Sequence, residues 1–300
     1  MTTSNGLLLV DKPRGLTSHD VVARVRRILH EKKVGHAGTL DPMATGLLVL
    51  GVGPSTRLLR FAQAETKRYV GVVMFGVATD SLDADGTTVE EREVPSLSKD
   101  AVEAATQSMI GPQLQTPPMV SAIKIDGQRL HELARRGVEV ERRSREITVS
   151  AFTLSPTDDP SLWRFEVECS VGTYVRVLLS DLAFRLGTIG HLVELRRTAS
   201  GSHVVDDALT LDAFAEMVEQ GRDVVASPAT FVTELPHVIF DDDKIRAVRM
   251  GQRVTLTEEF RDDEIAAMDA SGELVAILQR RGESWKPALV LATADESARG

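Results

Sequence analysis

The sequence has only one cysteine among its 300 residues. A single thiol forms no internal disulfide, and no group of cysteine and histidine residues has the spacing of a zinc site. The longest apolar run, at 47–52, is far shorter than the roughly 20 residues that a membrane helix needs. The N-terminus also lacks the basic segment and long apolar stretch of a signal peptide. These absences predict a cytoplasmic protein without a metal site or membrane association.

Two common nucleotide-binding motifs are missing as well. Residues 51–57 combine glycines with hydroxyl side chains, but they lack the lysine and the spacing of a phosphate-binding P-loop. No G-x-G-x-x-G pattern follows a predicted strand, so a dinucleotide-binding fold is equally unsupported.

The charge of the chain is unevenly distributed. The formal net charge of −9 argues against a nucleic-acid partner, because phosphate contacts need a local excess of lysine and arginine. Yet residues 12–36 hold seven basic side chains against two acidic ones, and 124–145 hold seven against four. Residues 80–103 and 206–223 are strongly acidic instead. Two basic segments on an acidic chain favour a polyanionic partner over merely solvated helix faces.

With 42% hydrophobic and 26% charged residues, the chain has enough apolar side chains for one large domain and a smaller one. Apolar periodicity predicts interleaved strands and helices without a regular βαβ repeat, which favours the α+β class. Strands are predicted over 6–10, 47–52, 68–75 and 163–170, and helices from Thr17 onward and over 99–110, 174–186 and 211–220. Cys169 lies in an alternating strand pattern and is expected to be a small core residue.

The C-terminal part has a different pattern. Pro228 and Pro236 flank a predicted linker, and the short runs 254–256, 273–278 and 288–292 beyond it are typical of strands. The sequence therefore predicts a small, β-rich C-terminal unit.

The segment from Gly35 to Gly46 places one carboxylate, that of Asp41, in a glycine-rich turn five residues after His36. Its glycines allow the backbone to approach a bulky ligand closely. Two interpretations remain open at this point. Asp41 is either a catalytic acid or the N-cap of a helix whose first residue is Pro42.

Five short motifs occur in order along the chain: Lys12-Pro13-Arg14-Gly15, the Gly35–Gly46 segment, Lys67-Arg68-Tyr69, Gly172-Thr173-Tyr174-Val175-Arg176 and Leu195-Arg196-Arg197. Through them the sequence resembles the bacterial tRNA pseudouridine-55 synthase family, from about Gly6 to about Ser202. The resemblance implies a mixed, largely antiparallel sheet with flanking helices and a cleft across it. It also implies isomerisation of uridine to pseudouridine at position 55 in the tRNA T-loop, with no cofactor or metal.

The resemblance also implies roles for single residues. Asp41 matches the catalytic carboxylate, which either attacks C1′ of the ribose or removes a sugar proton. Arg176 matches its ion-pair partner, Tyr69 the aromatic that stacks on the target base, and Leu195 the floor of the base pocket. Tyr174 is expected to line the same pocket, and His36 matches the residue that stacks in place of the extruded bases.

The segment of about 116–145 resembles the family's thumb, which closes on the RNA stem-loop. Its Lys124, Arg129 and Arg136 are expected to contact phosphates without reading the base sequence. The expected organisation is a catalytic domain over 1–232 and a PUA-like RNA-binding domain over 237–300. The expected partner is the T-stem-loop of tRNA, bound by a monomer without an obligate protein partner.

Three alternatives stay open from the sequence. A tRNA-binding folding chaperone with secondary or no isomerase activity would carry the same binding features. The guide-RNA-dependent relatives of the family have similar motifs, but usually an N-terminal extension and a fuller C-terminal barrel that are not evident here. A carboxylate hydrolase would need a second acid in a matching motif, which the sequence does not offer.

Replacing Arg129 and Arg136 together with alanine tests the thumb assignment. If both contact phosphates, the salt dependence of RNA binding should flatten by roughly 1–2 units of log–log slope. Filter binding of a T-loop hairpin and an unrelated hairpin over a salt series measures this, and both RNAs should weaken alike. An unchanged slope would identify the two arginines as a solvated surface.

Overall fold

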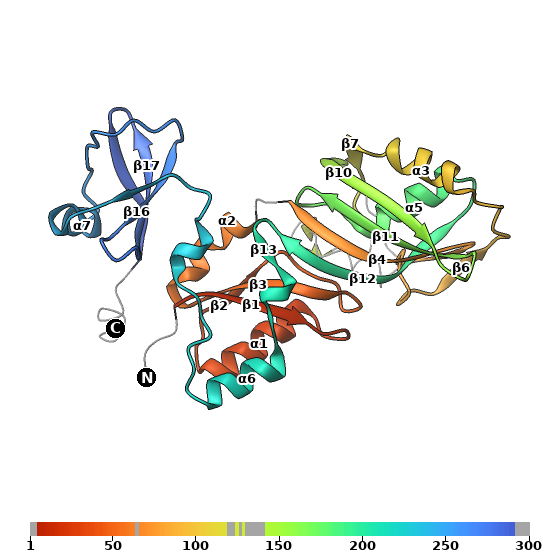
Figure 1. The fold of residues 1–300 in the computed structure, drawn as a ribbon, viewed down its shortest axis with the longest axis horizontal. Helices are drawn as coiled ribbons and strands as arrows, with labels where there is room; N and C mark the ends of the chain where they lie inside the picture. The colour runs from red at the N-terminus through yellow and green to blue at the C-terminus, as the bar shows by residue number, and fades with distance from the viewer. Residues whose placement is uncertain (1–4, 64–65, 119–123, 126–127, 130–141, 292–300) are drawn as a thin grey trace.

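A computed structural model describes residues 5–63, 66–118, 124–125, 128–129 and 142–291 of the chain (Figure 1). Within these ranges, no helix combines the length and the apolar character that crossing a membrane requires.

A ten-stranded mixed sheet forms the main body (Figure 1). Its strands are β1 (Gly6–Lys12), β2 (Val34–Ala37), β3 (Thr45–Val52), β4 (Lys67–Phe75), β7 (Gly111–Gln115), β10 (Arg145–Pro156), β11 (Leu162–Cys169), β12 (Gly190–Ser200), β13 (His203–Val204) and β14 (Leu209–Thr210). The order is β14-β1-β3-β12-β4-β11-β10-β7, with β2 paired to β3 and β13 to β12. Among the described strands of this sheet, β1 with β14 and β3 with β12 are the parallel pairs. The predicted α+β class with a largely antiparallel sheet is confirmed.

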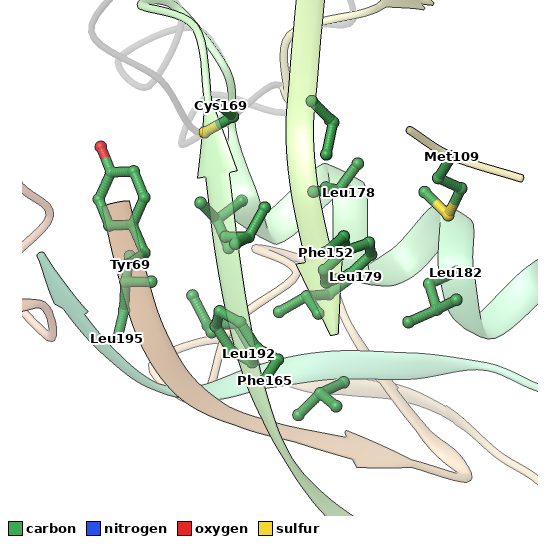
Figure 2. Packing of buried hydrophobic residues seen from close by; sticks show 14 of the residues in the cluster. Tyr69, Met109, Phe152, Phe165, Cys169, Leu178, Leu179, Leu182, Leu192 and Leu195 are labelled. Carbon is green, nitrogen blue, oxygen red and sulfur yellow. The ribbon is translucent and has the colours of Figure 1, made fainter. Parts of the chain in front are cut away.

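The helices cover the two halves of this sheet separately (Figure 1). They are α1 (Ser18–Leu29), α2 (Leu59–Gln63), α3 (Lys99–Gln107), α5 (Val175–Arg185) and α6 (Leu211–Glu219), with short 3-10 helices at η1 (Gly53–Leu58), η2 (Val205–Asp207) and η3 (Pro228–Phe231). α1 lies beside α6 and packs Val21 and Val25 against the β1–β3 half. Leu178 and Leu182 of α5 are buried in the cluster that also contains Phe165 of the other half (Figure 2).

Local sequence explains where α1 begins. The Thr17 hydroxyl accepts a hydrogen bond from the backbone NH of Asp20, and the Asp20 carboxylate accepts one from the backbone NH of Thr17. This reciprocal capping box satisfies two backbone donors at the helix start. The helix predicted from Thr17 is confirmed, and so is the burial of Cys169, which is fully inaccessible.

The Asp41 segment is a turn and not a helix. The backbone NH of Ala44 donates to the Asp41 carbonyl at 3.1 Å, and the chain then enters β3 at Thr45. The interpretation of Asp41 as a helix N-cap is therefore wrong, because no helix follows Pro42.

The C-terminal part forms a second sheet in the order β15-β16-β17-β18. Its elements are β15 (His237–Ile239), β16 (Glu264–Met268), β17 (Leu274–Arg281), β18 (Ser284–Val290) and the helix α7 (Asp242–Arg249). The predicted strand at 254–256 is wrong, since Val254 makes one isolated bridge to Trp285 that its neighbours do not extend. Two smaller sheets pair β5 (Val77–Thr79) with β6 (Thr88–Glu91), and β8 (Lys124–Ile125) with β9 (Gln128–Arg129).

The two sheets share one apolar cluster. Leu47 and Val49 of β3 belong to the same buried cluster as Ile277 and Leu289 of the C-terminal sheet. The segment predicted to be a linker is not an exposed connection, because Phe231 and its neighbour Val232 are buried in this cluster. The ion pair of Arg60 with Glu264, at 2.8 Å, adds a polar contact at the same junction. The C-terminal unit is thus joined to the main body through one shared apolar cluster.

Ile277→Ala should lower the free energy of unfolding by about 2–5 kcal/mol, because the side chain is fully buried in the shared cluster. Urea unfolding followed by fluorescence and circular dichroism should still show one transition, since both sheets contribute to that cluster. The control Val89→Ala, at an exposed site, should change stability by less than about 0.5 kcal/mol. Separate melting of the C-terminal sheet, with the rest unaffected, would contradict a shared core.

Candidate active site

A cavity of about 380 Å³ opens at the junction of the two halves of the main sheet. Its lining includes five of the six site residues predicted from the sequence outside the thumb: Asp41, Tyr69, Tyr174, Arg176 and Leu195. These residues come from segments up to 154 positions apart, between 41 and 195 in the chain. Lys67, Arg145 and Arg197 also line the cavity, and Asp41 is the single acid among its described lining residues.

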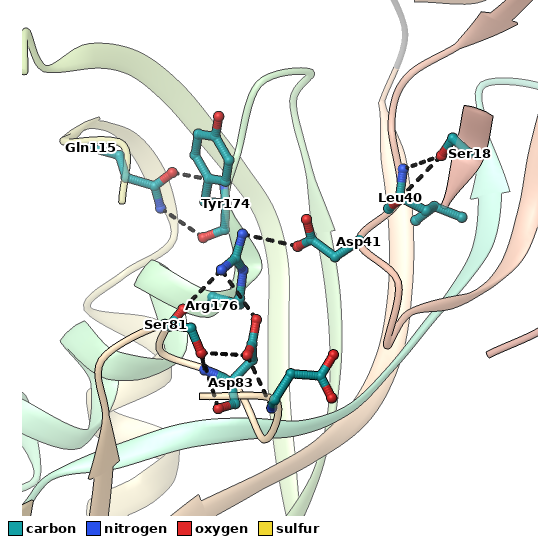
Figure 3. Close-up of polar contacts among 9 residues, drawn as sticks. Ser18, Leu40, Asp41, Ser81, Asp83, Gln115, Tyr174 and Arg176 are labelled. Atoms are coloured by element: carbon teal, nitrogen blue, oxygen red, sulfur yellow. Dashed lines mark hydrogen bonds and ion pairs between the residues drawn. The ribbon is translucent and has the colours of Figure 1, made fainter. Parts of the chain in front are cut away.

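Asp41 is held by a buried arginine. Nη2 of Arg176 lies 3.0 Å from Oδ2 of Asp41, and the Arg176 side chain is 3% exposed (Figure 3). The Asp41 side chain keeps 38% of its surface accessible, so the carboxylate is anchored from behind and open toward the cavity. Charge-assisted pairing of this kind orients a carboxylate and favours its ionised form.

The same arginine binds a second acid that sequence reasoning missed. Nη1 of Arg176 lies 3.1 Å from Oδ2 of Asp83 and donates to the carbonyl of Ser81 at 2.8 Å. Asp83 is itself buried, and its Oδ1 accepts a hydrogen bond from the Ser81 hydroxyl at 2.5 Å (Figure 3). The turn that presents it contains Leu82 at a φ of 63°, a conformation uncommon for a non-glycine residue. Only the Thr-Asp-Ser-Leu-Asp stretch at 79–83 marked this turn in the sequence, and no motif singled out Asp83.

Burial raises the pKa of the Asp41 carboxyl above its usual value; Arg176 opposes this rise, and the charge of Asp83 adds to it. Lys12 is fully inaccessible and lies behind the same turn, where its ammonium donates to the carbonyls of Leu16, at 2.6 Å, and Pro42, at 3.3 Å. Burial lowers the pKa of Lys12 to about 8, while Asp41 acts in the opposite direction. The position of Lys12 fits a role in shaping the turn, since its nitrogen binds backbone oxygens.

Tyr69 and Leu195 form an apolar wall of the cavity. Both side chains are largely buried and belong to the cluster that extends to α5 (Figure 2). The Tyr69 ring lies at the edge of that cluster, with its hydroxyl pointing away from the packed side chains (Figure 2). A flat ring beside a leucine suits an aromatic base.

Tyr174 and Arg145 form another part of the rim. The Arg145 guanidinium lies 4.6 Å from the centre of the Tyr174 ring, a cation–π contact. Gln115 fixes the Tyr174 backbone through hydrogen bonds of 2.7 and 3.1 Å (Figure 3). The backbone of Tyr174, at the start of α5, is therefore held in position by the Gln115 side chain.

His36 is the predicted site residue that does not line the cavity. It lies on β2, and its ring packs edge-on against His19 with a centroid separation of 5.4 Å. Burial lowers the pKa of His36 to about 4, and the neighbouring His19 and Arg197 contribute, so the ring is neutral at pH 7.

Residues 26–175 match the family described as TruB family pseudouridylate synthase (N terminal domain). Residues 176–239 match a tRNA pseudouridylate synthase B C-terminal domain, and 235–292 match a C-terminal domain of tRNA pseudouridine synthase II. The chain belongs to the TruB family of pseudouridylate synthases. The predicted family and the predicted isomerase class are thereby confirmed.

Curated TruB relatives match along most of their length. The tRNA pseudouridine synthase B of Streptococcus sanguinis is 40% identical over 94% of this chain and 98% of its own. The protein of the same name from Rhodococcus jostii is 42% identical over 96% of this chain and 94% of its own. That from Opitutus terrae is 50% identical over 70% of this chain and 86% of its own.

Solved structures show the same fold. A Cbf5-Nop10-Gar1 complex contains a chain that matches with a TM-score of 0.74 and 26% identity, covering 98% of this chain and 87% of that one. A chain from an H/ACA RNP bound to a substrate RNA containing 2′-deoxyuridine matches with the same TM-score at 23% identity, with the same coverage of both chains.

The thumb-like segment is described only in part. Arg136 and the side chains of Lys124 and Arg129 lie outside the described residues, so their phosphate contacts stay predictions. The two ends of the segment lie together, since the hydroxyls of Thr116 and Ser144 are 2.8 Å apart. The insertion therefore leaves and re-enters the sheet at one place, between β7 and β10.

Asp83→Asn tests the function of the second carboxylate. Removing the Asp83 charge should lower the pKa of Asp41, because that charge now adds to the rise. Since an ionised Asp41 is then present at lower pH, the acid limb of the single-turnover rate profile should move to lower pH. The rate at neutral pH should fall roughly 10–100-fold, because Arg176 loses one of its two anchors.

The matched control is Asp85→Asn, which removes the same charge from an exposed side chain two residues along the chain. It should leave both the rate and the acid limb unchanged. If both variants behave alike, the effect is one of general charge and not of the Arg176 network.

Proposed function

We propose that this protein isomerises uridine to pseudouridine at position 55 in the T-loop of tRNA, with Asp41 as the catalytic carboxylate. The observation that supports this most directly is the arrangement around the cavity. One carboxylate, anchored by a buried arginine, opens into a space lined by cations, an aromatic ring and a leucine. The names of the curated relatives, each a tRNA pseudouridine synthase B, support tRNA as the substrate.

The reaction needs few chemical groups. The C1′–N1 bond breaks, the uracil turns, and a C1′–C5 bond forms. C5 gives up its proton and N1 gains one, so the reaction is neutral in electrons and needs no external atom. Asp41 either attacks C1′ or removes a proton from the sugar, and both routes require an ionised carboxylate next to the ribose. The Arg176 ion pair supports that charge state.

The base must leave the RNA stack to reach the cavity. In the proposal the nucleotide flips out, its uracil stacks on Tyr69 above Leu195, and Tyr174 lines the same pocket. Arg145 and Lys67 give the pocket the positive potential that attracts a phosphate-flanked nucleotide. His36 lies on the strand that leads into the Asp41 turn and is uncharged, which suits a ring that stacks in place of the extruded bases.

The remaining chain would hold the RNA outside the cavity. We assign catalysis to residues 1–232, closure on the stem-loop to the insertion at about 116–145, and a further RNA contact to a PUA-like unit at 237–300. The protein is proposed to act as a monomer. A folding chaperone with lost isomerase activity is less well supported, because the Asp41–Arg176 pair and Tyr69 are all intact.

Asp41→Asn separates catalysis from binding. The amide keeps the size of the side chain but removes its charge and nucleophilicity, so turnover should fall below detection. Binding of the T-loop RNA should stay within about tenfold, a difference of at most ~1.4 kcal/mol. Single-turnover tritium release from C5-labelled uridine in a T-loop hairpin measures the first, and filter binding the second.

Asp85→Asn serves again as the control and should release tritium at the wild-type rate. Near-normal release by Asp41→Asn would overturn the assignment of the catalytic carboxylate. Tight binding without any release by the unchanged protein would instead favour the chaperone.

A further inference from the structure

Arg197 is a fully buried arginine at the centre of the main sheet, with 1% of its surface exposed. It lies on β12, the strand between β3 and β4. Its backbone is in register with Gly46 of β3 on one side and with Tyr69 of β4 on the other. Arg197 is therefore placed between the strand that follows the Asp41 turn and the strand that holds the stacking ring.

The guanidinium of Arg197 closes the Asp41 loop. Its Nε donates to the Leu47 carbonyl at 2.7 Å, and its Nη2 donates to the Gly38 carbonyl at 3.1 Å. Gly38 and Leu47 stand on either side of Asp41 in the sequence. Because the guanidinium is planar and rigid, these two bonds set the separation of the two ends of the loop.

Glycines make this approach possible. A Cβ atom at Gly46 would come within 2.3 Å of the Arg197 backbone oxygen, and Gly46 has a φ of 98°. A Cβ atom at Gly38 would come within 3.4 Å of Arg197 Nη1, and that residue has a φ of 85°. Both positions therefore favour glycine for conformational reasons, and Gly46 does so for lack of space as well.

Arg197 also faces the base-stacking ring. Residues in register on neighbouring strands present their side chains to the same face of the sheet, and the Arg197 guanidinium lies beside the Tyr69 hydroxyl. Its other partners are the two carbonyl oxygens, and among the described residues it forms no salt bridge with a carboxylate. Burying a cation without an acid partner is costly, so stability alone is a poor explanation for it.

We propose that Arg197 is a positioning residue that fixes the Asp41 loop relative to Tyr69. This inference rests on the proposed function, in which Asp41 acts on the ribose and Tyr69 stacks on the base of the same nucleotide. The rigid guanidinium of Arg197 then sets the distance between Asp41, which acts on the sugar, and Tyr69, which holds the base. A displacement of about 1 Å in such an arrangement costs on the order of 100-fold in rate.

The neighbouring Arg196 offers a matched control. It lies on the same strand, but its guanidinium forms two hydrogen bonds of 2.8 and 2.9 Å with Asp11 and it does not line the cavity. Arg197→Lys and Arg197→Met are compared with Arg196→Lys and Arg196→Met. Single-turnover tritium release from a C5-labelled T-loop hairpin, filter binding of that hairpin and urea unfolding are measured for all four.

Arg197→Lys should release tritium roughly 10–100-fold more slowly than the unchanged protein, with the Kd for the hairpin within about threefold. Lysine keeps the charge of arginine but not the planar guanidinium that forms the two hydrogen bonds. Methionine lacks both, so Arg197→Met should be slower still. Both Arg196 variants should keep the rate within about twofold, even where urea unfolding shows an equal loss of stability. If Arg197→Met does not fold, the lysine variant decides alone.

A folded Arg197→Lys variant with a rate within threefold of Arg196→Lys would overturn the inference. So would a rate loss that disappears at saturating RNA, because positioning should lower the rate of the bound complex. Failure of the unchanged protein to release tritium would refute the proposed function instead. Release that Asp41→Asn abolishes and Arg197→Lys leaves intact would refute only the role of Arg197.

Discussion

Burial of the Arg176 guanidinium is the constraint on which the site depends. Acidic partners stabilise a guanidinium that is only 3% exposed, and the fold supplies Asp41 on one side and Asp83 on the other. The two acids differ in environment, since Asp83 is enclosed by the Ser81 turn and Asp41 opens into the cavity. The same ion network that makes the buried charge tolerable therefore leaves one carboxylate oriented and accessible.

The backbone around Asp41 is fixed from several sides. The Ser18 hydroxyl bonds the NH and carbonyl of Leu40, Lys12 bonds the Pro42 carbonyl, and Arg197 bonds both ends of the loop. Leu47 and Val49 of the strand that follows are buried in the apolar cluster that the main body shares with the C-terminal sheet. A loop held in this way presents its carboxylate with little reorganisation, as the catalytic role proposed for Asp41 requires. Although the chain is acidic overall, four of the described cavity-lining side chains are cationic, so positive charge is concentrated at this cavity.

Local patterns predicted most of the regular elements. The capping box at Thr17, the apolar run of β3 and the alternation of β11 each fix their structure within a few neighbouring residues. The elements that were missed depend on distant partners. β12, a central strand, has a mixed polar and apolar sequence because Arg197 is buried in the sheet while Arg196 pairs with Asp11 on the other face. The strand prediction at 254–256 was wrong for the opposite reason. The residues there are β-like, but only Val254 has a pairing partner in the fold.

The sequence by itself determined the identity of the chemical groups. The motifs around Asp41, Tyr69, Arg176 and Leu195 were sufficient to identify the family. Their residue types and their order along the chain can be read from the sequence without knowing any distance in the fold. Only the tertiary structure decided how these groups are held. Asp83 belongs to no motif, and Arg197 stands in the Leu195-Arg196-Arg197 motif without a role that the sequence assigns. Their places in the network come from burial, register and bonds between residues more than 90 positions apart, such as Arg176 with Ser81 and Arg197 with Leu47. Those contacts exist only in the folded protein, because a buried charge is paired with groups that are near it in space and not along the chain.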